Sequence, residues 1–243
     1  MADLETPLTR RRALQLAGGL GLAAVIPACA TDGGSASPET TAATTTAEAS
    51  TETAAGATAA PDCVLMPELT EGPYYLDLDL VRSDLTEGRP GLPLDLRVNV
   101  VDAGSCEPIE GAAVDVWHCD AEGAYSGVQG AEGETFCRGV QMTDGNGTAE
   151  FRTVFPGWYT GRAVHIHLKV AADGDQTHTG QLFFDPETLS AVYAAEPYAA
   201  RGEPDQPNES DGIYAESGGV TVIAVSVDGE SSSGAVTLGV DRA

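Results

Sequence analysis

Hydrophobic and polar residues alternate in several short stretches between residues 94 and 240. A period of two is typical of β-strands that bury one face and expose the other. Gly, Pro, Asn and Asp separate the stretches, and TDGNG at 143–147 is a strong turn signal because Gly and Asn tolerate positive φ. The pattern predicts strands at 94–102, 111–119, 148–155, 162–170, 180–185, 219–227 and 234–240.

One stretch has convincing helical character. Residues 186–198 begin with Pro186, which favours the first turn of a helix, and Pro197 would end that helix. Several short strands with regular turn signals and a single short helix predict an all-β fold. We expect a two-sheet β-sandwich with loops.

Residues 1–29 have the pattern of an export signal. Arg10–Arg12 precede an apolar run that stops at small residues before Cys29. The arginines resemble a twin-arginine signal, and IPAC at 26–29 resembles a lipobox, in which the cysteine is lipidated after cleavage. Cleavage at the A-x-A-like site 28–30 is the alternative and would leave a soluble protein. We expect an exported, extracellular or cell-surface protein, with lipidated Cys29 as a candidate membrane tether.

Residues 30–61 are almost entirely Thr, Ala, Ser, Gly and Glu, without an aromatic residue to seed a core. This composition predicts a disordered tether. The remaining residues, 62–243, are numerous enough to bury a core of their own. We therefore expect one folded domain there.

The chain is strongly acidic, with 37 Asp and Glu against 12 Lys and Arg, a net charge of −25, and Lys169 as the only lysine. Such a surface repels nucleic acid and anionic lipid, so we expect no nucleic-acid partner and interpret the acidic residues as a solvated shell. An anionic aromatic substrate would be repelled at long range. Its attraction would require a cation inside the cleft.

The cysteines suggest disulfides. Setting aside Cys29 leaves Cys63, Cys106, Cys119 and Cys137, and an even number in an oxidising compartment predicts two disulfides with three conceivable pairings. We expect Cys63 to pair with Cys106 and Cys119 with Cys137. Buried free thiols are the alternative.

Two of the four histidines stand two residues apart in the predicted strand 162–170. Residues i and i+2 share one face of a strand, so His165 and His167 are expected side by side, while Val164 and Ile166 point into the core. Two imidazoles on one face can chelate one metal ion. Histidines on a solvated strand face are the alternative.

The surrounding residues discriminate among metals. A cupin H-x-H pattern requires a glutamate further along, but position 172 is Ala, and no carboxylate in the strand offers the third ligand of a catalytic zinc site. The neighbouring candidates are tyrosines. Phenolate is a hard oxygen ligand that suits Fe(III), which lowers the phenol pKa enough to deprotonate it.

From about residue 66 to residue 185 the chain resembles the intradiol ring-cleavage dioxygenases, the family of the protocatechuate and catechol dioxygenases. The matching segments are TEGPYY at 70–75, PIEGAAVDVWHCDAEGAYS at 108–126, PGWY at 156–159, RAVHIH at 162–167 and GQLFF at 180–184. The last of these segments matches the family's strand whose glutamine lies near the substrate.

The resemblance implies a non-haem Fe(III) centre. The resemblance implies that Tyr159 is both a metal ligand and a base that takes a proton from the substrate. Arg162 is implied to stabilise negative charge on the ring, and Gln181 to assist by hydrogen bonding. The implied metal ligands are Tyr125, Tyr159, His165 and His167.

On this resemblance, residues 62–243 form an intradiol dioxygenase β-sandwich with a prealbumin-like core. The implied reaction uses O2 to cleave the bond between the two hydroxylated carbons of a catecholic substrate, giving a cis,cis-muconate-type diacid. Two residues separate Tyr159 from Arg162, fewer than in typical members, so the ring substituent is not carried over. A monomer and a homodimer both remain open.

Two alternatives stay in view. Segments 111–117 and 143–151 also resemble prealbumin-like binding and stalk domains, which are non-catalytic sandwiches, although a stalk has no use for two tyrosines and two histidines together. An aromatic-binding relative that has lost its iron is the other alternative. No ligand position is substituted here, which disfavours it.

The remaining conspicuous residues have structural interpretations. Trp117 is expected in the core, His118 as a structural histidine and His178 in a loop. Tyr74 and Tyr75 are expected either to line the mouth of a pocket or to pack on the sandwich.

Overall fold

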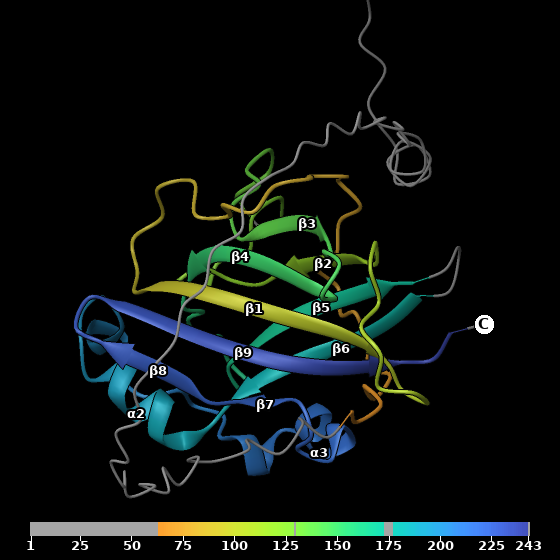
Figure 1. Ribbon diagram of the computed structural model, residues 1–243. Coiled ribbons are helices and arrows are strands. Elements are labelled where there is room, and N and C mark those ends of the chain that lie inside the picture. Colours follow the sequence, from red (N-terminus) through yellow and green to blue (C-terminus); the bar gives the residue numbers. More distant parts are fainter. Residues whose placement is uncertain (1–62, 129, 173–176, 243) are drawn as a thin grey trace, which may run out of the picture. The chain divides into compact units, whose positions relative to one another are not determined.

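The computed structural model describes residues 63–128, 130–172 and 177–242. Two sheets pack against one core (Figure 1). Sheet A has the strand order β4-β1-β9-β8 and sheet B the order β3-β2-β5-β6-β7, so the predicted all-β, two-sheet sandwich is confirmed. The strands are β1 (Pro93–Asp102), β2 (Ala113–Trp117), β3 (Arg138–Met142), β4 (Thr148–Val154), β5 (His165–Ala171), β6 (Thr177–Phe184), β7 (Val222–Ile223), β8 (Val225–Asp228) and β9 (Ser231–Val240).

Apolar side chains of both sheets form the core. Leu94 and Leu96 of β1 are almost completely buried, as are Ile166 and Leu168 of β5. Burying each such side chain stabilises the fold by about 1.5–3 kcal/mol. Because side chains alternate along a strand, the residues of β5 that alternate with Ile166 and Leu168 face away from this core, towards the outer side of sheet B.

Most predicted strands are found with their ends shifted by at most three residues, but the structure differs from the prediction in two further respects. β3 was not predicted, because its sequence RGVQM shows little alternation. The predicted strand 219–227 is split: β7 pairs with β6 in sheet B, and β8 pairs with β9 in sheet A. The chain passes from one sheet to the other at Ala224, so no single strand can span the stretch.

The predicted helix is shorter than expected. Helix α2 covers Pro186–Tyr193, and Asp185 caps it by accepting a bond from Thr188 N at 2.9 Å. Short 3₁₀ turns follow at Tyr198–Arg201 and Asn208–Ser210. Helix α3 (Gly212–Ser217) was not predicted.

The stretch 63–92 lacks long strands but is held to both sheets. Leu69 N donates to Thr179 O of β6, and Leu85 N donates to Arg152 O of β4. With the loop after β2, this stretch helps to cover the outer face of sheet B. All five residues of β2 are consequently buried.

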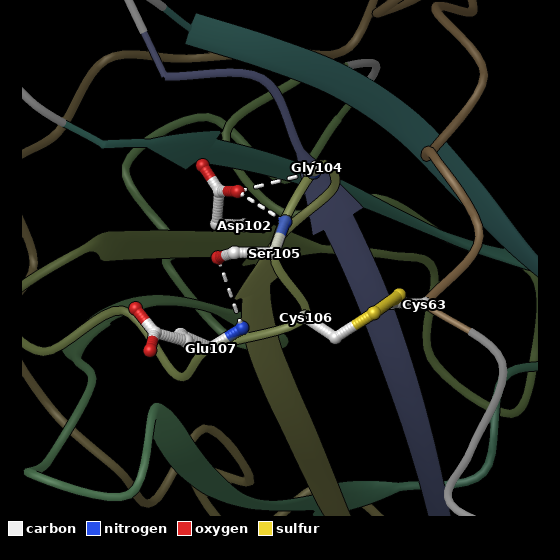
Figure 2. The surroundings of a disulfide bond; sticks show 6 residues. All are labelled: Cys63, Asp102, Gly104, Ser105, Cys106 and Glu107. Atoms are coloured by element: carbon white, nitrogen blue, oxygen red, sulfur yellow. Dashed lines mark hydrogen bonds between the residues drawn. A yellow bond between two sulfur atoms is a disulfide. The ribbon is translucent and has the colours of Figure 1, made fainter.

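A disulfide ties this stretch to the turn after β1, as predicted for Cys63 and Cys106 (Figure 2). Asp102 shapes that turn, because one carboxylate oxygen accepts from Gly104 N at 3.0 Å and Ser105 N at 2.7 Å. The bond joins residues 43 apart. A closed loop of this length contributes about 4 kcal/mol in the chain-entropy account.

The second predicted disulfide is wrong: Cys119 and Cys137 are buried free thiols. Trp117 pairs with Arg138, and His118 N donates to Cys137 O, so Cys137 lies across from His118. Neighbouring residues along an extended chain point to opposite sides. Cys119 instead donates its thiol to Gly157 O at 3.3 Å.

The two histidines outside the predicted site are both buried. His118 is structural, as expected: its Nε2 lies 2.8 Å from Thr153 Oγ1 and its Nδ1 2.7 Å from Cys119 O. The loop predicted for His178 is wrong, because this residue lies in β6. Its Nδ1 is 3.0 Å from a carboxylate oxygen of Glu68.

The predicted export signal at 1–29 and tether at 30–61 lie outside the described residues. Within the described ranges, no helix has the length and apolar character needed to cross a bilayer.

Candidate metal centre

On the face of sheet B that points away from the core, polar side chains of neighbouring strands lie next to one another. The register aligns Trp117 of β2 with His167 of β5, and His167 with Gln181 of β6. His165 lies on the same face, two residues before His167. All four side chains are at most 2% exposed, so this face is buried rather than solvated.

The two tyrosines reach this face from loops. Asp120 orders the loop before Tyr125, because one of its carboxylate oxygens accepts from Ala124 N at 2.9 Å. Tyr159 follows β4, and Gly157 lets its loop approach the first one: a Cβ there would lie 2.4 Å from Ala121 O. Only glycine therefore fits at this crossing.

Four donor atoms converge around His165. Its Nε2 lies 3.0 Å from His167 Nε2, 3.2 Å from Tyr159 Oη and 3.5 Å from Tyr125 Oη. Its Nδ1 lies 2.6 Å from Ala163 O, which holds the proton on Nδ1 and leaves the Nε2 lone pair directed at the cluster. Spacings of about 3 Å suit ligands that each lie about 2 Å from one ion.

Burial keeps all four groups neutral in the absence of a cation. It lowers the pKa of His165 to about 3 and that of His167 well below its ordinary value. It raises the pKa of Tyr159 to about 12 and that of Tyr125 well above its ordinary value. Neutral imidazoles are ready to bind a metal, whereas the phenols need its positive charge to ionise.

These donors suit a hard, highly charged ion. Two phenol oxygens would become anionic ligands, which favours Fe(III) over softer or less charged ions. Within the described ranges, His, Cys, Asp and Glu side chains alone do not gather in threes as a metal site. The tyrosines are therefore needed to complete a coordination shell.

Aromatic rings wall the cluster. Trp117 stacks on His167 with ring centres 4.9 Å apart, and Tyr75 packs on Trp117 at 4.8 Å. Tyr74 lies 4.6 Å from Tyr125. Trp117 is buried as expected, but in this outer cluster rather than between the sheets. The rings fix the orientation of His167 and lower the local dielectric constant.

Arg162 and Gln181 lie together beside the donors. Arg162 Nη2 donates to Gln181 Oε1 at 2.6 Å, and Gln181 Nε2 donates to Thr70 O at 2.9 Å. Arg162 Nε donates to Asp211 Oδ2 at 2.8 Å. Sequence reasoning missed Asp211. Its position before α3 is a helix-cap signal, but no local pattern links it to a residue 49 positions away.

The structure thus brings all six predicted site residues to one place. Four supply the converging donors, and two form a hydrogen-bonded pair beside them. They come from β5, β6, the residues preceding β5 and the two loops that end at Tyr125 and Tyr159.

Comparisons with known proteins show that the chain is similar to dioxygenases. The "Dioxygenase" family model matches residues 67–201. The structure of an intradiol ring-cleavage dioxygenase from Tetranychus urticae is 36% identical, with a TM-score of 0.70 over 74% of this chain and 95% of that one. The dioxygenase domain of a carbohydrate-binding fusion from Streptomyces sp. SirexAA-E is 30% identical, with a TM-score of 0.59 over 74% of this chain and 100% of that one.

Among curated proteins, the chlorocatechol 1,2-dioxygenase of Pseudomonas putida is 30% identical over 136 residues, which is 47% of this chain and 52% of that protein. The chain thus spans about half the length of the curated relatives it matches. All six predicted site residues lie within the family match, whereas Asp211 lies beyond its end.

Proposed function

We propose that this chain, which belongs to the intradiol ring-cleavage dioxygenase family, uses a non-haem Fe(III) and O2 to split a catechol between its two hydroxylated carbons. The product would be a cis,cis-muconate-type diacid. The convergence of two imidazole nitrogens and two phenol oxygens carries the proposal: His167 Nε2 and the two tyrosine Oη atoms lie 3.0–3.5 Å from His165 Nε2. The family match decides against the stalk-domain alternative.

The residues fit the implied metal. Tyr125, Tyr159, His165 and His167 would hold it, because their four donors face one point in a buried, ring-walled cluster. When bound, iron would supply a positive centre that ionises and orients the two substrate oxygens and makes the ring reactive towards O2. The phenols would then balance two of its three charges.

The two tyrosines differ in exposure, which separates their roles. Tyr125 is 5% exposed, while Tyr159 is half-buried. The more exposed Tyr159 is the phenol that an incoming substrate hydroxyl can reach, whereas Tyr125 is enclosed. We assign to Tyr159 Oη the removal of a proton from a substrate hydroxyl, and to Tyr125 a permanent ligand role.

Arg162 and Gln181 would stabilise the ring as oxygen attacks. The guanidinium carries a fixed positive charge and is held by two hydrogen bonds, so it needs little reorganisation when negative charge develops nearby. Gln181 is fixed between Arg162 and Thr70 O. Its role is to hold the guanidinium in place by hydrogen bonding.

The charge pattern favours neutral catechols. The net charge of −25 repels carboxylated rings, and Arg162 is already paired with Asp211 at 2.8 Å. The matched Pseudomonas putida relative is called a chlorocatechol 1,2-dioxygenase. We propose catechol and substituted neutral catechols as substrates, ahead of protocatechuate.

The proposal is tested by turnover with labelled oxygen. Iron-loaded protein is given catechol, chlorocatechol and protocatechuate under ¹⁸O2, and oxygen uptake and product mass are recorded. We expect both labelled atoms in an acyclic diacid and a strong loss of turnover in Tyr159→Phe. Tyr198→Phe is the matched control, because its buried hydroxyl binds Phe155 O in the main core. A ring-opened product carrying one carboxylate and one aldehyde would contradict the cleavage position.

We further propose export and lipidation at Cys29, resting on the sequence of residues 9–29. The Cys63–Cys106 disulfide supports an oxidising destination. Fractionation of cells labelled with a fatty acid tests this. We expect label on the membrane-bound wild-type protein and none on Cys29→Ser, whereas equal labelling of the two would contradict lipidation at this residue.

A further inference from the structure

Asp211 is a buried carboxylate with two separate sets of bonds. Its Oδ1 accepts from Ile213 N at 2.8 Å and Tyr214 N at 3.0 Å, which caps helix α3. Its Oδ2 accepts from Arg162 Nε and from Ala163 N, both at 2.8 Å. Capping α3 uses only one oxygen. The other is committed to the segment that leads into His165.

The residues around Asp211 brace the same segment at further points. Trp158 Nε1 donates to Gly202 O at 3.1 Å, and Gly161 N donates to Asp205 Oδ1 at 3.3 Å. Residues 202–211 thus run along 158–163, which carries Tyr159 and Arg162. The bracing residues lie beyond the family match, which ends at 201.

We propose that Asp211 is a positioning residue, which fixes the Arg162 guanidinium beside the metal donors so that it meets the catechol ring. This inference rests on the proposed function. Arg162 has rotatable bonds that would let the guanidinium leave the site, and two anchors restrain it, Gln181 Oε1 and Asp211 Oδ2. Asp211 is the charged anchor, and its side chain is completely buried. Misplacing a catalytic group by about 1 Å lowers turnover by as much as about 100-fold.

The chain offers a substitution that separates the two roles of Asp211. Asparagine caps helices as well as aspartate does, so the oxygen of Asp211→Asn preserves the cap on α3. Its amide nitrogen replaces the charged oxygen and cannot accept from Arg162 Nε or Ala163 N. Asp185→Asn is the matched control, because Asp185 also caps a short helix, accepting from Thr188 N at 2.9 Å. Within the described residues, the Asp185 side chain bonds to Thr188, and Arg162 forms its ion pair with Asp211 instead.

Four readouts are compared in the iron-loaded full-length protein: iron content, melting temperature, kcat for catechol, and catechol affinity from anaerobic titration of the visible band. For Asp211→Asn we expect kcat to fall by roughly 10- to 100-fold, with iron content equal to that of Asp185→Asn. The visible band of the substrate complex should shift, because the charge next to the bound ring has moved.

A double-mutant cycle shows whether the effect passes through Arg162. In an Arg162→Gln background there is no guanidinium to place, so adding Asp211→Asn should change kcat and catechol affinity by less than about twofold. A purely structural role would instead lower both parameters by the same factor in either background.

The outcomes are distinct. Wild-type protein that binds no iron and consumes no oxygen contradicts the proposed function and this inference with it. An active wild type with Asp211→Asn indistinguishable from Asp185→Asn contradicts this inference alone. Equal losses in the two backgrounds also overturn it.

Discussion

The outer faces of the two sheets carry polar residues in opposite circumstances. On β1 of sheet A, Asp95 and Arg97 are exposed between buried leucines and valines. On β5 of sheet B, His165 and His167 occupy the equivalent alternate positions but are each 2% exposed, with the rings of Tyr125 and Tyr159 packed beside them. Apolar and polar residues alternate along both strands, but only β5 has buried polar side chains.

This difference distinguishes polar residues that only contact solvent from polar residues that form a site. An exposed polar residue remains hydrated and carries no desolvation penalty, whereas a buried one must form hydrogen bonds within the protein. His165 has Ala163 O, and Gln181 has both Arg162 and Thr70. Buried polar groups that point at one another are costly to maintain for stability alone. Their concentration on sheet B therefore marks the site.

The largest effect is expected from removing one of the four donor side chains on the buried outer face of sheet B. His167→Ala removes one of four converging atoms, and we expect iron affinity to fall at least about 100-fold, with turnover lost. Asn99→Ala on the outer face of sheet A is the control and should bind iron like the wild type. Metal analysis after dialysis measures both. An iron-replete His167→Ala protein with normal turnover would remove His167 from the ligand set.

The next effect comes from the ring that supports His167. Trp117→Ala opens a cavity against a stacked imidazole, and we expect the free energy of unfolding to fall by about 3–5 kcal/mol. Trp117→Phe keeps a stacking ring and should lose less. Urea unfolding of the metal-free protein measures the difference. A loss under about 1 kcal/mol for the alanine variant would show that the ring packs loosely.

A pH effect is expected from His118, which is buried near Thr153. Burial lowers its pKa from 6.5 to about 4, so the unfolded chain takes up the proton first. The associated stability is present above pH 6.5 and is lost as pH falls towards 4, by about 3 kcal/mol. In His118→Gln, stability should fall less steeply over this range. Parallel curves for the two proteins would contradict the assigned shift.

The smallest effect is expected on sheet A. Arg97 and Glu150 form an ion pair at 2.6 Å, with side chains 57% and 65% exposed. Solvent screens such pairs, so Arg97→Gln should change the free energy of unfolding by less than about 1 kcal/mol and leave iron binding unchanged. Thermal melts at low and high salt measure it. A large loss would mean that the two outer faces differ less than their exposure indicates.

The two outer faces also differ in how far the sequence could predict them. Alternation alone predicts β1 and the shared face of His165 and His167, because both follow from a period of two. Tyr125 and Tyr159 lie in loops without periodicity, so only the family resemblance could link them to the histidines. Their approach depends on the close crossing at Gly157, which is a tertiary contact.

The mispredicted features share this cause. Cys119 and Cys137 are close in sequence, but the pairing of β2 with β3, a strand that shows little alternation, sets them out of register. The split of 219–227 between two sheets depends on which edges are free. The partnership of Asp211 with Arg162 joins two chain segments through one carboxylate. Such long-range relations leave no local signal.

The most direct test of the central claim is the iron content and visible spectrum of the purified, folded protein. Four donors around one ion predict about one iron per chain and a colour arising from phenolate bound to Fe(III), which weakens in Tyr125→Phe. A folded protein that remains colourless and metal-free when supplied with iron would contradict the claim.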